Sequence, residues 1–271
     1  MKQIKKILVS TGAGISVASG IHPFRGSNGL WENSLIEEIA TYAGWQRNPK
    51  KIFEFYKKLS ETYESKLPTE AHKALVLLEN AFGINFNCIT QNADGLHEKA
   101  GLKNLIHLHG TLDVININDE LFRSTFKETP EYKFGLRPNI VLFGEMPKLT
   151  VTELLTYTKD CDLYLSIGTS DNVAPANNTF HKFLPKECHK VQFNIEKTIF
   201  SGCYDEIILG DVEKTLPLFV NTVKLSKPLI SDHPSTEEVY QKREQEVKDG
   251  NGISVKELIK KLREKHNSKI K

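Results

Sequence analysis

A short apolar run followed at once by closely spaced glycines constrains this chain more than any other stretch of its sequence. The run is residues 7–9, and Gly12 and Gly14 follow it. β-prone apolar residues in unbroken succession predict a strand buried on both faces. Glycines after such a strand permit a sharp turn close to a phosphate, and a helix opened by Ser16 and the residues after it would offer N–H groups to that phosphate. We therefore expect residues 7–26 to form a cofactor-binding strand, turn and helix.

The same stretch departs from the dinucleotide fingerprint. Val17 stands where a third glycine is required, and a helical pattern follows where a strand bearing an acidic residue is required. A lone Gly-Ala-Gly turn after a strand is more often an ordinary tight turn than a nucleotide site. Phe24 and Arg25 lie between Gly20 and Gly26, and we expect them to form a loop that folds over a bound ligand.

Further apolar runs alternate with helical patterns along the chain. The expected strands beyond the first are residues 86–90, 105–108, 162–167, 190–195 and 207–210, and helical spacing occupies most of residues 33–81. With right-handed crossovers, this alternation predicts an α/β fold with a Rossmann-like parallel sheet and helices on both faces. Ligands of such sheets gather at the carboxyl ends of the strands.

Composition excludes several classes of protein. A length of 271 residues with 39% hydrophobic content suits one large domain, or one large and one small. The 36 basic and 34 acidic residues nearly balance, so charge gives no general argument for nucleic acid, and we expect no nucleic-acid partner. No apolar run is long enough to span a bilayer, so we expect no membrane association and a cytoplasmic protein. The four scattered cysteines favour reduced thiols over a disulfide framework.

Four further motifs follow the opening stretch in order. They read TQNADGLH at 90–97, HG at 109–110, FGE at 143–145 and GTS at 168–170. Together with the opening stretch they resemble the sirtuin family, over about residues 7–220. The resemblance implies an NAD-dependent protein-lysine deacylase (deacetylase), with NAD as cofactor and nicotinamide and O-acyl-ADP-ribose as products.

The resemblance also implies a role for each motif. His109 and Asn92 would be the catalytic residues, His109 as the general base that acts on the ribose hydroxyls, a task that suits an imidazole. NAD would lie against the cofactor set, which comprises Gly12, Ala13, Gly14, Ser16, Phe24, Arg25, Gln91, Asn92, Asp94, Gly168, Thr169, Ser170, Asn194, Glu196, Asp211 and Val212. An acyl-lysine protein or peptide would bind by strand addition along the substrate set, which comprises Val141, Phe143, Gly144, Glu145 and Val173.

Two histidines, His107 and His109, share one face of the strand expected at 105–108. Paired histidines raise the question of a metal, but no further ligand lies nearby at a suitable spacing. We expect no metal there, and we expect His107 to be structural.

The segment from 111 to 136 departs most from the family. Many sirtuins hold a structural zinc here with two C-x-x-C pairs, whereas this chain has no cysteine between Cys88 and Cys161. We therefore expect a reduced small domain without zinc, formed by insertions at about 33–66 and 111–136 of a catalytic domain that spans 1–225. In the second insertion we expect a short helical or looped module packed by Phe126, Tyr132 and Phe134.

The tail from 226 to 271 differs in composition, and the resemblance does not cover it. Ser235 with Glu238, and Ser254 with Glu257, have capping-box spacing, which predicts two helices. The second would be amphipathic and basic, and we favour self-packing or self-association over contact with another partner or an anionic surface.

Other functions remain open. An NAD glycohydrolase or ADP-ribosyltransferase on the same fold is favoured by the missing zinc module and by His22-Pro23, where the family commonly has an aspartate. A catalytically silent NAD-binding sensor is a third reading, disfavoured by the retention of His109 and Asn92. Residues 30–32 lack the Tyr and Arg pair associated with succinyl-lysine, so we expect a neutral acyl group.

Overall fold

The computed structural model describes residues 4–22, 30–31, 34–117, 120–170 and 176–225 of the chain. Its main sheet has six parallel strands in the order β11-β10-β9-β1-β4-β5. The strands are β1 (Ile7–Thr11), β4 (Phe86–Thr90), β5 (Leu105–His107), β9 (Leu163–Ile167), β10 (His189–Asn194) and β11 (Glu206–Leu209). The predicted parallel sheet is confirmed.

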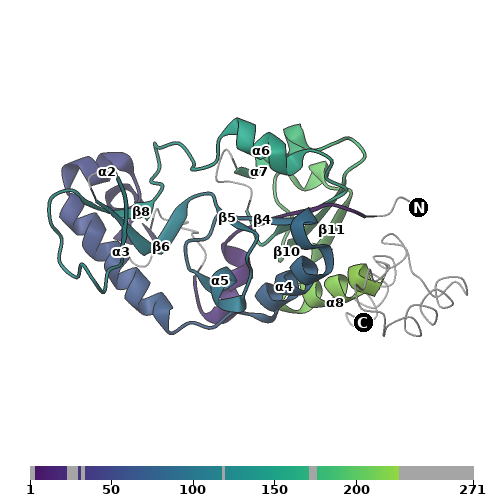
Figure 1. Cartoon of the computed structure of the whole chain (residues 1–271), viewed down its shortest axis with the longest axis horizontal. Coiled ribbons are helices and arrows are strands. Elements are labelled where there is room, and N and C mark those ends of the chain that lie inside the picture. The colour runs from purple at the N-terminus through teal and green to yellow at the C-terminus, as the bar shows by residue number, and fades with distance from the viewer. Residues whose placement is uncertain (1–3, 23–29, 32–33, 118–119, 171–175, 226–271) are drawn as a thin grey trace, which may run out of the picture.

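Helices cover both faces of this sheet (Figure 1). They include α4 (Glu70–Phe82) and α8 (Val212–Leu225) on one face, and α6 (Val151–Thr158) and α7 (Ala176–Phe183) on the other. Ile7 and Val9 of β1 belong to the apolar cluster that contains residues of α4 and α8, whereas Leu8 belongs to the cluster with α6 and α7. Since neighbouring residues of a strand point to opposite faces, a strand covered on both sides reads as a continuous apolar run.

A second, smaller assembly lies at one end of the molecule (Figure 1). Helices α2 (Tyr42–Arg47) and α3 (Pro49–Glu64) pack there beside an antiparallel sheet in the order β7-β6-β8. These strands are β6 (Gly110–Ile117), β7 (Glu120–Ser124) and β8 (Leu136–Ile140), and the short elements α1 (Ile36–Ile39), β2 (Leu30–Trp31) and β3 (Ser34–Leu35) precede α2. The remaining short elements are η1 (Ala13–Ser19), η2 (Gly83–Asn85), α5 (Leu96–Ala100) and η3 (Ser201–Cys203).

The strands of this second assembly correct one expectation. Residues 111–136 contain most of β6 and all of β7, where a helical or looped module was expected. Phe126 and Tyr132 do pack on Phe53, with ring centroids 5.2 and 5.6 Å away. Phe134 does not belong to that cluster, because it lies in a turn with Gly135 at positive φ and its side chain is 97% exposed. The two helices expected in the tail lie outside the described residues.

Polar caps fix the beginnings of helices α3 and α4. Asn48 accepts a hydrogen bond from the Lys51 N–H, with Pro49 in the first turn of α3. Thr69 and His72 form a capping box at the start of α4. The second cap brings His72 to the region behind the carboxyl ends of β1 and β4, where it takes part in the site described next.

Candidate active site

The turn after β1 lies directly against the turn after β9. The Gly12 N–H donates to the Ile167 carbonyl oxygen at 2.9 Å, and the Gly14 N–H donates to that of Gly168 at 2.8 Å. A Cβ atom added to Gly12 would lie 2.8 Å from the Gly168 oxygen, and one added to Gly14 would lie 2.5 Å from the Gly168 Cα atom. Only glycines allow this approach. The helix that follows, η1, is a 3₁₀ helix that begins at Ala13 rather than at Ser16.

A cavity of about 630 Å³ opens at this edge of the sheet. Its size is that of a small-molecule site. The members of the cofactor set that line it are Gly12, Ala13, Gly14, Gln91, Asn92, Asp94, Gly168, Thr169, Ser170, Asn194, Asp211 and Val212. The members of the substrate set that line it are Val141, Phe143, Gly144 and Glu145.

The remaining members of the two sets do not line the cavity or cannot be placed. Ser16 is fully buried behind the cavity wall and reaches the site through Asp94. Glu196, two residues beyond the end of β10, is not among the lining residues. Phe24, Arg25 and Val173 lie outside the described residues.

Hydrogen bonds from the β1 turn hold the polar side chains that follow β4. The Ser16 hydroxyl donates to Asp94 Oδ2 at 2.6 Å, and the Leu96 N–H donates to Asp94 Oδ1 at 2.9 Å. The Asn92 amide nitrogen donates to the Gly12 carbonyl oxygen at 3.1 Å and to Ser16 Oγ at 3.3 Å. The amide and the carboxylate therefore have fixed orientations at the cavity wall.

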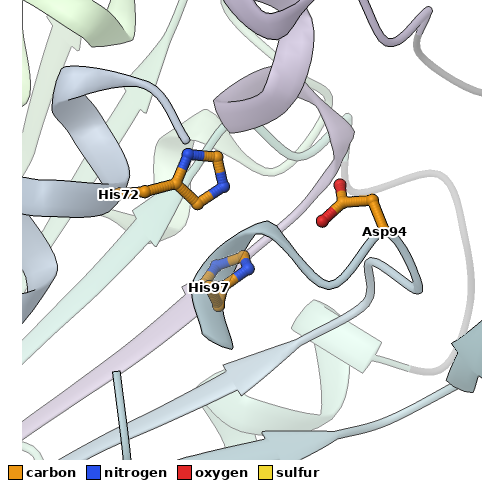
Figure 2. A group of neighbouring side chains, drawn as sticks. All are labelled: His72, Asp94 and His97. Carbon is orange, nitrogen blue, oxygen red and sulfur yellow. The ribbon is translucent and has the colours of Figure 1, made fainter. Parts of the chain in front are cut away.

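Two buried histidines, His72 and His97, lie beside Asp94 (Figure 2). One ligand atom from each of His72, Asp94 and His97 lies within 4.8 Å of the others, close enough to hold a metal ion. Burial, reinforced by the neighbouring His97, lowers the pKa of His72 to about 3. Burial also lowers the pKa of His97 to about 4, so both rings are neutral at pH 7. The sequence predicts no role for either residue, although His97 ends the motif at 90–97.

His97 and His72 of this cluster each contact the hydroxyl group of a threonine. Nε2 of His97 lies 3.0 Å from Thr11 Oγ1, and Nδ1 of His72 lies 2.9 Å from Thr69 Oγ1. Nε2 of His72 is buried and has no hydrogen-bond partner among the described residues. The three side chains thus form a packed polar layer beneath the cavity wall.

A contact with the Gln91 carbonyl oxygen and the close packing of the neighbouring Gly110 fix the position of His109. Its Nδ1 lies 3.2 Å from the Gln91 carbonyl oxygen, and because a carbonyl only accepts, Nδ1 carries the hydrogen and Nε2 carries the lone pair. Burial lowers the pKa of His109, and the hydrogen bond to Gln91 opposes this only in part. Gly110 has φ +85°, and a Cβ atom there would lie 1.7 Å from the Asn139 oxygen. The ring is thus a neutral base, fixed at the point where β6 begins.

The segment that contains Val141, Phe143, Gly144 and Glu145 is tied to both parts of the molecule. The Val141 N–H donates to the His109 carbonyl oxygen at 2.9 Å. The Phe143 N–H donates to the Ala40 oxygen at 2.8 Å, and the Phe143 oxygen accepts from the Tyr42 N–H at 2.9 Å. This segment therefore bridges the base and the helices α1 and α2.

The family model and the curated relatives that match this chain agree with one another. The model of the Sir2 family matches residues 12–175. An NAD-dependent protein deacylase of Pasteurella multocida is 39% identical over 236 residues, which are 81% of this chain and 97% of that protein. One of Bdellovibrio bacteriovorus is also 39% identical, over 81% of this chain and 97% of its own length.

Solved structures resemble this fold as well. A Sir2 homologue in complex with NAD has a TM-score of 0.73 and 30% identity, over 82% of this chain and 90% of that chain. A complex of Sir2 with a p53 peptide and NAD+ has a TM-score of 0.66 and 25% identity, over 79% of this chain and 91% of that chain. In the described part of the chain, no helix has the length and apolarity needed to cross a membrane. The family match, the two curated relatives and the shared fold together establish that this chain belongs to the Sir2 family.

Proposed function

We propose that this protein is an NAD-dependent protein-lysine deacylase that releases nicotinamide and O-acyl-ADP-ribose. The observation that carries the proposal is the placing of one neutral imidazole, one amide and one carboxylate on a single cavity wall: His109, Asn92 and Asp94. The relatives named as NAD-dependent protein deacylases support the same activity.

The cavity suits NAD because the small residues Gly12, Ala13, Gly14 and Gly168 line it, and the turns that carry them lie at the carboxyl ends of parallel strands, where nucleotide phosphates bind. The residues proposed to hold NAD are the cofactor set defined above. When bound, NAD supplies a ribose carbon whose bond to nicotinamide is the bond that breaks. Asn92 and Asp94, fixed by Ser16, would orient the ribose, and Nε2 of His109 would take a proton from a ribose hydroxyl.

The acyl-lysine would enter between residues 141–145 and helix α3. Apolar and aromatic side chains line this side of the cavity, namely Ile21, Tyr56, Leu59, Tyr63 and Leu142. None of these five carries a charge at pH 7 that could pair with an acidic acyl group, since burial raises the pKa of Tyr56. We therefore propose a neutral acyl group on a lysine of a protein substrate.

The chain is further proposed to fold without a structural zinc. The sequence has no cysteine between Cys88 and Cys161, and the apolar packing of Phe126 and Tyr132 on Phe53 offers a metal-free core for the segment where many sirtuins bind zinc.

Residues 1–225 are proposed as the catalytic domain, with insertions at about 33–66 and 111–136, and residues 226–271 as a separate extension. A chain truncated after residue 225 should bind NAD as tightly as the full chain, which calorimetry would measure. A tenfold weaker affinity would place the tail inside the catalytic domain.

The decisive experiment follows NAD consumption by the purified protein with and without an acetyl-lysine peptide, with nicotinamide and the ADP-ribose product identified by mass spectrometry. Turnover that requires the peptide and yields O-acetyl-ADP-ribose supports the deacylase. Turnover without peptide that yields free ADP-ribose would replace it with an NAD glycohydrolase, and ADP-ribose found on a protein would replace it with an ADP-ribosyltransferase.

A further inference from the structure

His107, the last residue of β5, and His109, two residues beyond it, contact two consecutive carbonyl groups. Nδ1 of His109 lies 3.2 Å from the Gln91 oxygen, and Nδ1 of His107 lies 3.2 Å from the Asn92 oxygen. The expected strand at 105–108 ends at His107, so His109 lies beyond it, yet the two rings still contact neighbouring peptide groups of the segment after β4. His107 was expected to be merely structural, yet it contacts the main chain of Asn92, a residue of the cavity wall.

The other nitrogen of His107 faces a carboxylate. Its Nε2 lies 2.5 Å from Glu98 Oε1, so the ring bridges β5, helix α5 and the segment after β4. Both partners only accept hydrogen bonds, so the two contacts are satisfied together only when both nitrogens carry hydrogen. The side chain of His107 is 17% exposed and that of Glu98 is 46% exposed, so the ring is mostly covered while the carboxylate stays in contact with solvent.

The charges around the ring favour this doubly protonated form. Burial lowers the pKa of His107, but the hydrogen bond and negative charge of Glu98, with the Asn92 carbonyl and Asp113, outweigh burial and raise that pKa above its ordinary value. The neighbouring imidazole, His97, is kept neutral by its own burial and adds no opposing charge at pH 7.

Loss of one proton from the ring would break one particular contact. The single hydrogen that remains has two acceptors to choose from, and a carboxylate is the stronger acceptor. The hydrogen therefore stays with Glu98, and the lone pair of Nδ1 then faces the Asn92 carbonyl oxygen. The Asn92 carbonyl group loses this hydrogen bond, although the N–H of the same residue still donates to Thr90 Oγ1 at 3.0 Å.

We propose that His107, held by Glu98, is a positioning residue that sets the orientation of Asn92, so that deprotonation of His107 at alkaline pH weakens NAD binding. This inference rests on the proposed function of the cavity as an NAD site. It goes beyond that function because it assigns a role to a pair that would not touch NAD.

Two substitutions separate the two contacts of the ring. The amide nitrogen of an asparagine can occupy the place of Nδ1, and that of a glutamine the place of Nε2. H107N should therefore keep the bond to Asn92, and H107Q should keep only the bond to Glu98. Since a hydrogen bond from a charged donor contributes about 1.5–3 kcal/mol, H107Q should weaken NAD binding by about tenfold or more, whereas H107N should stay within about threefold of wild type.

The measurement is the dissociation constant of NAD by calorimetry from about pH 6 to 9.5, without peptide, beside the KM values for NAD and for an acetyl-lysine peptide. Wild type should lose affinity as the pH rises through the raised pKa of His107. H107N should lose this fall in affinity at high pH, the alkaline limb of the profile, and E98Q should move it to lower pH. The KM for the peptide should stay within about twofold in all variants.

Three results would overturn the inference. The first is an H107Q variant whose NAD affinity and pH profile match wild type. The second is an equal loss of affinity in H107N and H107Q, together with a fall in Tm, which would mean a purely structural role. The third is an alkaline limb that persists in H107N. A wild type that binds NAD with the expected pH dependence but does not deacylate the peptide would instead overturn only the proposed function.

Discussion

Nδ1 of His109 lies 3.2 Å from the carbonyl oxygen of Gln91, so that only Nε2 of this ring can act as a base in the cavity. H109N places an amide nitrogen where Nδ1 lies and removes the base. Because general-base catalysis contributes about 10²- to 10⁴-fold, kcat for deacylation should fall within that range. The KM for NAD should change by no more than about threefold. A kcat that stays within tenfold of wild type would exclude His109 as the base.

The pH profile of the wild type gives an independent check on the same ring. Burial lowers the pKa of His109 below its ordinary value of 6.5, and the base acts only when neutral. Activity should therefore persist as the pH falls through 6.5 and decline only below it. The measurement is kcat/KM for NAD at saturating peptide from about pH 5 to 8. A decline centred at or above pH 6.5 would contradict this ordering.

Gly110 should tolerate no side chain. In G110A the new Cβ atom would lie 1.7 Å from the Asn139 oxygen at a backbone φ of +85°, so the main chain of β6 or β8 must move. We expect a loss of about 3 kcal/mol or more in the free energy of unfolding, measured by urea denaturation. G202A is the control, since in the part of the chain that the structure describes no atom lies within 4 Å of a Cβ atom added there. Equal stability of the two variants would contradict the geometry.

Thiol reactivity should distinguish one cysteine from three. Cys203 is exposed, whereas Cys88, Cys161 and Cys188 are buried. An aromatic disulfide reagent should therefore modify one thiol quickly in the native protein and all four in urea, as counted by absorbance. C203S should abolish the fast phase. A fast phase of two thiols would mean that one of the three buried positions opens readily.

Metal analysis of the purified protein should find less than about 0.1 zinc per chain, since a structural zinc would need a set of four ligands. Chelator treatment should accordingly leave Tm unchanged. Stoichiometric zinc would contradict the proposal. His72, Asp94 and His97 would then be the group to substitute first, because they are the candidate ligands found among the described residues.

Sequence patterns predicted the sheet better than the small assembly. The strand from Ile7 is a continuous apolar run because helices cover both its faces, and such a run is visible without a structure. In β6, however, Leu112 and Ile115 are both buried three residues apart, because the register with β8 shifts between Gly110 and Ile115. That irregularity replaces the alternation of a strand by a spacing that resembles a helix.

The sequence could not predict which side chains from different elements of the site contact one another. Gln91, Asn92 and His109 occur in motifs, and their presence on one cavity wall could be expected from the carboxyl ends of neighbouring strands. The contact between His107 and Glu98 depends on how helix α5 packs beside β5, which no local pattern states. The available signal was the presence of a carboxylate nine positions before the histidine, and such a spacing is too common to be informative.

The close packing of main chain at Gly12, Gly14 and Gly168 limits how the sequence of this protein can evolve. A Cβ atom at any of the three positions would meet main-chain atoms, and one at Gly12 would also meet Thr169 Cβ, so enlarging one position cannot be compensated by shrinking another. Single substitutions at these three glycines should therefore not be tolerated, whereas the apolar side chains of α3 that line the cavity can be replaced one at a time. Lineages descended from this chain should vary in the acyl groups they accept long before they vary in how they hold the nucleotide.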